Sequence, residues 1–393
     1  MPKKKLLIAG GGYADIPLIK AGRKLGYYVI SSGNRPDELG HKYSDQYQKC
    51  DFSDQKALLA LARSLKIDAI CPCTNDFSAL SSAYVAEKLG LKGHDSLQVT
   101  KILHHKDKYR TFCKENKIRA PKAKDYMEPQ KAIKDLDSFD LPVIVKPVDL
   151  TGGKGITRID SKDKASQAIN NAFNISKNKR IVIEEFIHGS NHGLSTLIVN
   201  KKVKFYFADN EHYFINKYMV SGASTPTSVS KKNIKSLIEE LEKMASILKL
   251  KDGILHVQFI LNNNTPYIIE ICRRPPGDLY VDFVTHATGI NYAAFIVKSF
   301  TGASIADIEH TEPNGYHTRH CVMANTPGKV KNIVFDKLIQ SKIIDKFMWC
   351  KKGDVIKNHL VQKCGIVFLS YDSKKDMLKT TCKLNNFIKV ITE

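Results

Sequence analysis

The spacing of apolar residues along the chain of 393 residues changes at Leu141. Before Leu141, short apolar runs alternate with segments in which apolar residues recur every three or four positions, which is typical of strands and amphipathic helices. Ser53 is the predicted N-cap of the second helix, and Gly90 is placed to end the third. This alternation predicts a parallel sheet with crossover helices. The predicted strands cover residues 4–10, 27–32 and 67–74, and the predicted helices cover residues 13–26, 53–66 and 76–90.

After Leu141 the apolar runs follow one another closely, which predicts a strand-rich region. A long helix is then expected at residues 232–250, and a mixed tail ends in a predicted edge strand at 387–392. The predicted strands cover residues 142–147, 155–159, 180–187, 193–199 and 203–208, followed by a hairpin of 253–261 and 266–272 and by helices at 280–289 and 291–302.

Charge and cysteine content narrow the class of protein. Lys and Arg number 61 against 40 Asp and Glu, which gives a net charge of +21. This charge fits either nucleic-acid binding or a lysine-rich surface with a site for anionic substrates. The lysines are spread along the chain without an aromatic-interleaved basic stretch, which disfavours nucleic acid as a partner. The nine scattered cysteines, and the lack of an apolar run of the ~20 residues that span a bilayer, predict a cytoplasmic protein with no membrane segment.

Residues 143–159, VIVKPVDLTGGKGITRI, hold the most informative motif. A Walker loop continues into a helix after its lysine, whereas Lys154 is followed by Gly155 and a β-like segment. The pattern therefore predicts a hairpin with a glycine-rich tip, where backbone N–H groups can approach a phosphate. Taken alone, this stretch fits an exposed turn equally well. Lys146 favours phosphate binding, because a lysine between apolar strand residues is costly to bury unless an anion meets it.

Further residues suit metal and phosphate chemistry. Gln258 and Glu270 follow apolar runs on the two strands of the predicted hairpin, so both can face one site. An amide oxygen and a carboxylate suit Mg²⁺, which keeps several waters and shares substrate phosphates. Arg273 and Arg274 come directly afterwards, and adjacent strand residues face opposite sides, so only one of the two is expected at that site.

In their order along the chain, these motifs resemble the ATP-grasp superfamily. DKYRTFC, residues 107–113, is similar to the segment that opens the ATP-grasp fold, and VIVKP is similar to its phosphate-contacting strand. TGGKGI resembles the flexible loop that covers the phosphates, and EEFIHG resembles the hinge that holds adenine. HVQFIL and YIIEICRRPPG resemble the metal-binding strands and the arginine behind them. Within the superfamily, the chain looks most like the carboxylate–amine ligase branch of biotin carboxylase, carbamoyl-phosphate synthase and L-amino-acid ligase.

The resemblance implies a role for each matching residue. Arg274 and Lys154 would be catalytic, and Gln258 and Glu270 would bind the metal. ATP and Mg²⁺ are the implied cofactors, with Mn²⁺ as an alternative metal. The residues implied in nucleotide binding are Lys108, Lys146, Gly152, Gly153, Lys154, Gly155, Glu185, Phe186, Ile187 and His192.

The resemblance also implies an α/β fold, namely an ATP-grasp fold with an N-terminal parallel-sheet domain and a C-terminal α+β segment. The expected domains are residues 1–100, 101–305 with a small lid at about 120–187, and 306–393. The implied activity is phosphorylation of a small-molecule carboxylate by ATP, followed by attack of an amine on the acyl phosphate. An amino acid is an expected substrate, and a homodimer is compatible with the resemblance.

Some positions depart from the family pattern or fit a simpler interpretation. His192 stands where a ribose-contacting carboxylate is common, and Cys272 stands where many members have a metal-binding Asn. These departures leave open a nucleotide-binding protein without ligase turnover, and a biotin carboxylase-like enzyme is a further alternative. Glu184 is expected to be a solvated residue at a strand end. The turn GGGYAD, residues 10–15, lacks the third glycine or alanine of a dinucleotide fingerprint. It is expected to be a tight strand-to-helix turn, and contact with a substrate is the less favoured alternative.

Overall fold

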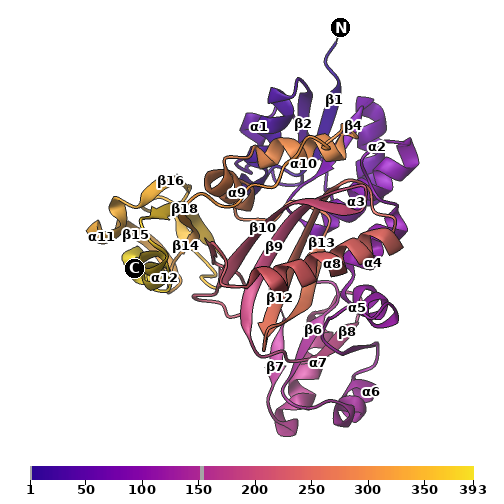
Figure 1. The fold of residues 1–393 in the computed structure, drawn as a ribbon, viewed down its shortest axis with the longest axis vertical. Coiled ribbons are helices and arrows are strands. Elements are labelled where there is room, and N and C mark those ends of the chain that lie inside the picture. Colours follow the sequence, from indigo (N-terminus) through magenta and orange to yellow (C-terminus); the bar gives the residue numbers. More distant parts are fainter. Residues whose placement is uncertain (1, 151–154) are drawn as a thin grey trace.

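The computed structural model describes residues 2–150 and 155–393. Four β-sheets form the framework, and the largest of them has eight strands and crosses the middle of the molecule (Figure 1). The N-terminal region lies at one end of the long axis, and a small antiparallel sheet lies at the other end. Within the described ranges, every helix is too short or too polar to cross a bilayer.

The N-terminal region is a parallel sheet with helices on both faces, as the alternating pattern predicts. Its strand order is β3-β2-β1-β4. The strands are β1 (Lys5–Ala9), β2 (Tyr28–Gly33), β3 (Gln46–Lys49) and β4 (Ala69–Pro72), and the helices are α1 (Ile16–Lys24), α2 (Gln55–Leu65) and α3 (Asp76–Leu89). Asp54, and not the expected Ser53, caps α2, because its carboxylate accepts hydrogen bonds from the first turn of the helix. Gly90 ends α3 with a left-handed φ of 66°, as predicted.

A four-stranded antiparallel sheet, in the order β5-β8-β6-β7, forms the opposite end of the molecule. It follows α4 (Leu97–His104) and α5 (Lys106–Glu115), and α6 (Pro129–Lys134) and α7 (Ala165–Ile175) cover one of its faces. The strands are β5 (Ala123–Tyr126), β6 (Val143–Pro147), β7 (Thr157–Ile159) and β8 (Ile181–Glu185). Val143 of β6 pairs with Ile159 of β7 in antiparallel register, so the predicted hairpin is confirmed.

The central sheet has the strand order β13-β12-β9-β10-β11-β14-β18-β16, and all of its neighbouring strands are antiparallel. One face packs against α8 (Lys231–Ile247), and the other packs against α9 (Tyr280–Thr288) and α10 (Tyr292–Phe300). The strands are β9 (Ser190–Val199), β10 (Lys202–His212), β11 (Gly222–Thr225), β12 (Gly253–Asn262), β13 (Thr265–Cys272), β14 (Tyr316–Met323), β16 (Ile343–Met348) and β18 (Lys363–Tyr371). The predicted hairpin of β12 and β13 turns at Asn263 and Asn264, which both have positive φ.

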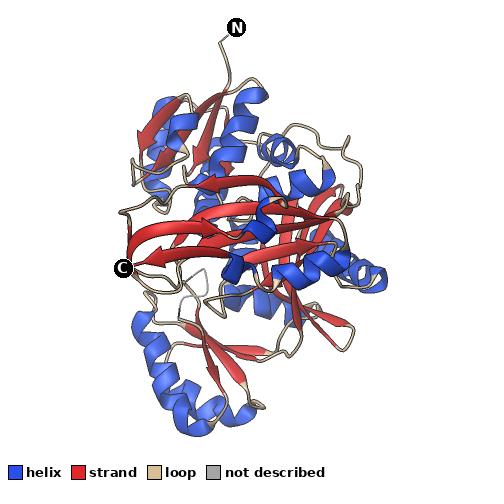
Figure 2. Ribbon diagram, turned by 90° about the vertical axis from the view of Figure 1, so that its left-hand side faces the viewer, coloured by secondary structure: helices blue, strands red, loops and turns tan. Residues whose placement is uncertain are grey.

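The C-terminal part of the chain adds strands to the central sheet and a small sheet beside it. The small sheet has the order β17-β15-β19, so β19 (Ile388–Thr392) is the edge strand that the sequence predicts. The other two strands of this sheet are β15 (Gly328–Phe335) and β17 (Val355–Ile356). The helices of the C-terminal part are α11 (Lys337–Gln340), α12 (Lys374–Thr381) and α13 (Leu384–Phe387). Figure 2 shows the long strands of the central sheet running across the molecule between the N-terminal region and the small antiparallel sheet.

One apolar core joins the N-terminal region to the central sheet. Leu6 and Ile8 of β1 point toward the same core as Phe205 of β10 and as residues of α9 and α10. This shared core fixes the loops after β1 and β4 close to β10, β12 and β13. Because catalytic and binding groups commonly lie where the carboxyl ends of parallel strands meet another element, this junction is the natural place for a site.

Candidate nucleotide and substrate site

A cavity of about 1210 Å³ lies where the N-terminal, central and small antiparallel sheets meet. The loops after β1 and β4, strand β6, the segment after β8, and strands β10, β12 and β13 all contribute to its wall. The fold thus gathers residues from three separate parts of the sequence around one space. Of the residues assigned from sequence, those that line the cavity are Lys146, Glu185, Phe186, Ile187, Gln258, Glu270 and Arg274.

Lys146 is held at the cavity wall by a buried acidic partner. Lys146 and Glu184 lie on neighbouring strands β6 and β8 and on the same sheet face, since Ile144 is opposite Glu184 in the register. The Lys146 Nζ donates to Glu184 Oε2 at 2.7 Å, and the Arg110 Nε lies 3.0 Å from Glu184 Oε1. The expectation that Glu184 is a solvated strand-end residue is wrong, because it is 1% exposed and carries both ion pairs.

Glu184, Lys146 and Arg110 stabilise one another's charged forms. Burial raises the pKa of Glu184, but the Arg110 guanidinium and the Lys146 ammonium outweigh burial and hold the pKa at about 2. Burial lowers the pKa of Lys146, although the Glu184 carboxylate opposes this effect. Two cations share one carboxylate, so the cluster carries a net positive charge that faces the cavity. An anionic ligand such as a phosphate would complete the neutralisation.

The hinge residues follow β8. The backbone N–H groups of Glu185 and Phe186 donate to the carbonyls of Lys122 and Pro142, at 2.9 and 3.2 Å. The Glu185 carboxylate accepts from the Lys122 N–H at 2.9 Å, and the Arg158 guanidinium lies 4.2 Å from the centre of the Phe186 ring. The hinge is therefore a fixed segment, which suits a surface that receives a flat base.

Gln258 and Glu270 lie directly opposite each other on β12 and β13. The register shifts between Gln258 and Phe259, and such irregularities often re-aim side chains at sites. Lys106 lies 3.9 Å from the Glu270 carboxylate. No group of three or more His, Cys, Asp and Glu ligands occurs within the described ranges. A cage made by protein alone is therefore not present there, but an amide oxygen and a carboxylate fit Mg²⁺ that shares its coordination with phosphates and water.

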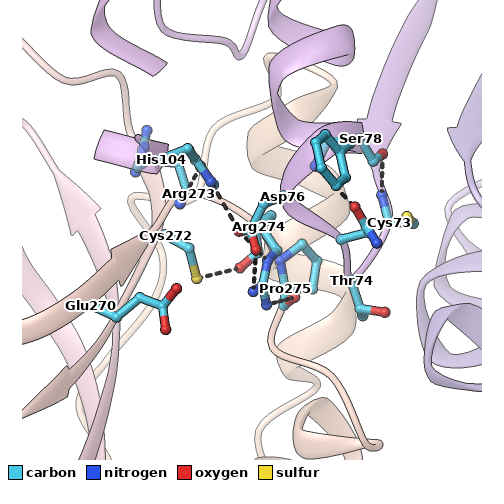
Figure 3. A network of polar contacts seen from close by, with 12 residues as sticks. Cys73, Thr74, Asp76, Ser78, His104, Glu270, Cys272, Arg273, Arg274 and Pro275 are labelled. Carbon is cyan, nitrogen blue, oxygen red and sulfur yellow. Dashed lines mark hydrogen bonds and ion pairs between the residues drawn. The ribbon is translucent and has the colours of Figure 1, made fainter. Parts of the chain in front are cut away.

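Arg274 points into the cavity from the segment after β13 and is held by a carboxylate of the N-terminal region (Figure 3). Its Nε and Nη2 donate to the two Asp76 carboxylate oxygens at 3.0 and 3.2 Å, and His104 contacts the same carboxylate at 3.0 Å. Arg273 instead pairs with Asp95 at 2.7 Å. The prediction that the two arginines face opposite sides is therefore confirmed.

The departure at Cys272 is a buried thiol and not an exposed nucleophile. Its Sγ lies 3.7 Å from the Arg274 carbonyl, and burial raises the pKa of the thiol to about 12. A thiol that stays protonated is a poor Mg²⁺ ligand, because Mg²⁺ prefers hard oxygen donors.

The glycine-rich tip is only partly described. Gly152, Gly153 and Lys154, together with Thr151, lie outside the described residues. Gly155 is described and does not line the cavity. It has a φ of 71°, and a Cβ there would lie 2.3 Å from the Ile175 side chain, so only glycine fits. For Gly155 the structure supports a role in the shape of the hairpin.

Two other assigned residues face away from the cavity, and a near neighbour of each lines it instead. Lys106 lines the cavity and Lys108 does not, because residues two apart on a helix point in different directions. Asn191 lines the cavity, whereas His192 is 1% exposed, stacks on Phe259 and has a pKa lowered by burial to about 4. Lys106 and Asn191 are therefore better placed than Lys108 and His192 for contact with a nucleotide.

Two further groups line the cavity without a residue-level role from the sequence. The GGGYAD turn, for which contact with a substrate was the less favoured interpretation, lines the cavity with Gly11 and Gly12. Asp15 fixes the turn by accepting from the N–H groups of Gly12 and Thr74 at 2.9 and 3.0 Å. A Cβ on Gly11 would lie 2.0 Å from the His41 ring, so the turn approaches its neighbour too closely for a side chain. The glycine run itself was the available signal.

The second group is a pair of carboxylates on β10. Asp209 and Glu211 are two residues apart, so they point to the same sheet face, and both line the cavity. Their spacing in FADNEHY was a signal, since the two acidic residues stand at alternate positions directly after the run FYFA.

Comparisons with known proteins agree with this architecture. Residues 105–278 match the family model described as ATP-grasp domain. The large chain of carbamoyl phosphate synthase from Pseudothermotoga lettingae is 22% identical over 324 residues, which are 78% of this chain and 29% of that protein. The chain therefore spans less than a third of the length of this curated relative.

Two solved structures share the fold over their whole length. Phosphoribosylglycinamide synthetase from Anaerococcus prevotii superposes with a TM-score of 0.79 and 21% identity, and L-amino acid ligase from Bacillus licheniformis superposes with a TM-score of 0.82 and 19% identity. In both comparisons, 100% of each chain is covered. At these identities, the likeness establishes the fold.

Proposed function

Because residues 105–278 match the ATP-grasp domain, we propose that the chain is an ADP-forming ATP-grasp ligase. In this proposal it activates a small-molecule carboxylate as an acyl phosphate and joins it to an amine, with an amino acid as one of the two substrates. The observation that carries this proposal is the arrangement at one cavity of a buried lysine, a hinge, an opposed glutamine and glutamate, and an arginine. These groups can hold the base, the phosphates and a metal ion of one nucleotide.

The chain's own residues supply positioning and charge. Lys146 and Lys106 face the cavity and would neutralise the phosphates of ATP, while the hinge at Glu185–Ile187 would hold the adenine. Gln258 and Glu270 would hold Mg²⁺ when it is bound with the phosphates, and the ion would supply neutralisation of the transferring phosphoryl group. Lys154, outside the described residues, keeps the role that its motif suggests.

Arg274 is proposed to orient the carboxylate substrate and then the acyl phosphate. A guanidinium offers a planar fork that matches both groups. In the structure its fork is engaged with Asp76, which holds the guanidinium at the cavity wall. The ligase proposal thus requires Arg274 to stay hydrogen-bonded to Asp76 while its remaining N–H groups donate to the substrate.

The amine half of the proposal is supported by the structural neighbours and by the site. One neighbour is named an L-amino acid ligase and another a phosphoribosylglycinamide synthetase, and both names describe joining reactions. The cavity volume of about 1210 Å³ exceeds the ~300–1,000 Å³ that an ordinary ligand pocket provides, which leaves room for two substrates beside a nucleotide. We also propose that residues 1–100, 101–305 and 306–393 are the three structural units that build this site.

The test is a survey of product formation. The protein is incubated with ATP, Mg²⁺ and pairwise combinations of the twenty amino acids and simple amines, and the nucleotides are separated by chromatography. Release of ADP and phosphate above the blank without substrate is the expected result. Release of AMP and pyrophosphate, or no release with any combination, would contradict the proposed mechanism.

A second candidate function is nucleotide binding without turnover. It is favoured by the bidentate Asp76 pair on Arg274 and by Cys272 beside the proposed metal ligands. Calorimetry separates the two candidates, because this alternative predicts ATP binding with no product from any substrate combination.

A further inference from the structure

Asp209 and Glu211 are two acidic groups at the cavity whose role is not explained by nucleotide binding. Asp209 is 0% exposed, and both side chains line the cavity from β10. None of the ion pairs within residues 2–150 and 155–393 includes either carboxylate. A buried carboxylate beside a half-buried one, with no ion pair to either, is costly, since buried charges in proteins are normally paired.

The hydrogen bonds of this pair are complete except at one oxygen. Glu211 accepts from Gln258 Nε2 and from the Tyr213 hydroxyl, each at 2.6 Å. Asp209 Oδ2 accepts from the Tyr280 hydroxyl. Asp209 Oδ1 is buried without a hydrogen-bond partner in the structure. An unpartnered buried carboxylate oxygen in a cavity wall is a place where a ligand with N–H donors would restore the missing bond.

The strand beside Asp209 leaves space for its carboxylate, because Gly193 of β9 lies opposite Asp209. A Cβ at position 193 of β9 would lie 2.7 Å from Asp209 Oδ2 and 3.1 Å from Oδ1, so Gly193 allows the acid to sit against the neighbouring strand. A larger residue there would push the carboxylate out of its place. The acidic group is thus built into the sheet from two strands.

Burial raises the pKa of both carboxylates. Burial raises the pKa of Asp209 to about 6, against the Tyr280 hydrogen bond and the Arg319 charge. Burial and the Asp209 charge raise the pKa of Glu211 to about 7. A cationic ligand at this place would favour the ionised form of both carboxylates. His256 and Tyr213 also face this region, and burial lowers the pKa of His256 to about 3, so its ring is neutral.

The pair adjoins the place where phosphoryl transfer is proposed. Gln258 links the two sites, because its side chain donates to Glu211 while its backbone position is opposite Glu270. A ligand at Asp209 and Glu211 would therefore lie beside the acyl phosphate. This is the side from which the second substrate must attack.

We propose that Asp209 and Glu211 bind the ammonium group of the amine substrate and hold it beside the acyl phosphate. The proposal rests on the proposed ligase function. The ammonium nitrogen releases one proton to solvent, and its lone pair then forms a bond to the acyl carbon. The bond between that carbon and the phosphate oxygen breaks, phosphate leaves with the electron pair, and the second proton departs with it. The products are an amide and hydrogen phosphate.

A metal ion fits this pair less well than an ammonium group. Each Glu211 oxygen already accepts one hydrogen bond and keeps one acceptor position, and Asp209 Oδ1 is unpartnered, so the pair offers isolated acceptor positions and no preformed metal cage. Within the described part of the chain, no third His, Cys, Asp or Glu completes a metal cluster. An ammonium group needs only two or three acceptors and no fixed coordination geometry.

The test compares Glu211→Gln and Asp209→Asn with a control, Glu239→Gln on the exposed side of α8. The substrates are the amino-acid pair that gives the fastest ADP release in the survey described above. A second assay replaces the amine with hydroxylamine, which is uncharged at neutral pH and traps the acyl phosphate as a hydroxamate. Binding of ATP with Mn²⁺ is measured by calorimetry in all variants.

We expect Glu211→Gln to raise KM for the amine about tenfold, with kcat for amide formation close to that of the control. Asp209→Asn should raise KM for the amine about tenfold, as loss of a charged hydrogen bond does. Hydroxamate formation and Mn²⁺·ATP affinity should stay at the level of the control. A change confined to the amine reaction distinguishes a role in binding the amine from general damage to the fold.

The proposal is overturned if both variants keep the KM of the control for the amine, or if hydroxamate formation falls in parallel with amide formation. A fall in Mn²⁺·ATP affinity would identify the pair as metal ligands and would also overturn it. Each of these results leaves ADP release by the unaltered protein intact. Absence of ADP release by the unaltered protein would instead remove the ligase function and this subsite with it.

Discussion

Replacing Glu184 with Gln removes the carboxylate that neutralises Lys146 and Arg110 inside the cavity wall. The pKa of Glu184 is held at about 2, against 4.5 for the ordinary group. One pKa unit corresponds to about 1.4 kcal/mol, so the ionised carboxylate contributes about 3 kcal/mol to the free energy of unfolding at pH 7. We expect Glu184→Gln to lower the stability by about this amount, because two buried cations lose their counter-ion.

The sign of the pH dependence follows from the direction of this shift. A carboxylate whose pKa is lowered by folding stabilises the protein fully above its unfolded pKa, near 4.5, and the contribution is lost as the pH falls toward about 2. Urea unfolding at pH 7 should therefore show the full difference between Glu184→Gln and the parent protein. The difference should shrink steadily over measurements from pH 4.5 downward.

The exposed Glu239→Gln change on α8 is the matched control, and it should alter stability by less than about 0.5 kcal/mol. If Glu184→Gln unfolds at the same urea concentration as this control at pH 7, the buried ion-pair cluster does not have the role described. A difference that does not vary with pH would likewise refute the electrostatic reasoning.

Three further predictions concern the cavity. Lys106→Met should weaken ATP binding about tenfold or more, through loss of a charged contact, whereas Lys108→Met should leave the affinity measured by calorimetry unchanged; equal effects of the two would refute the assignment to Lys106. Glu270→Gln should raise the Mg²⁺ concentration for half-maximal ADP release about 10–100-fold, and an unaltered Mg²⁺ dependence would remove Glu270 from the metal site. Gly11→Ala should lower the free energy of unfolding by about 1–3 kcal/mol, because its Cβ would overlap the His41 ring, and a stability equal to the parent in urea unfolding would show that the turn can relax.

Much of the fold was accessible from the sequence because its periodicity is strong. The N-terminal alternation predicted the parallel sheet, and the glycine-flanked hairpin of β6 and β7 was predicted from the β-like segment after Gly155. Local capping was less predictable, since Ser53 and Asp54 are both good caps and only the geometry of the loop selects Asp54.

The candidate site was predictable where one residue stands out from its strand. Lys146, Gln258 and Glu270 interrupt apolar runs, and all three line the cavity. Contacts between distant segments could not be found in this way. The Asp76 partner of Arg274 comes from the N-terminal region, and the burial of Glu184 depends on Arg110 from α5.

The other source of error was an offset of one or two positions between the residue that the motif indicated and the residue that lines the cavity. On a strand, a shift of one position reverses the face, so the motif pointed to His192 while Asn191 lines the cavity. On a helix, a shift of two positions has a similar effect, as Lys106 and Lys108 show. Sequence motifs locate such segments well, but the direction of each side chain is decided by packing.

The central claim is that Lys146 is a permanent contact for the nucleotide, and the ATP affinity of Lys146→Met tests it most directly. The matched control is Lys124→Met, which removes an exposed lysine of the same four-stranded sheet that pairs with Asp135. Calorimetry with ATP and Mg²⁺ should show an affinity about 10–100-fold weaker for Lys146→Met, as the loss of a charged contact of about 1.5–3 kcal/mol predicts, and an unchanged affinity for the control. Equal affinity of Lys146→Met and the parent protein would contradict the account.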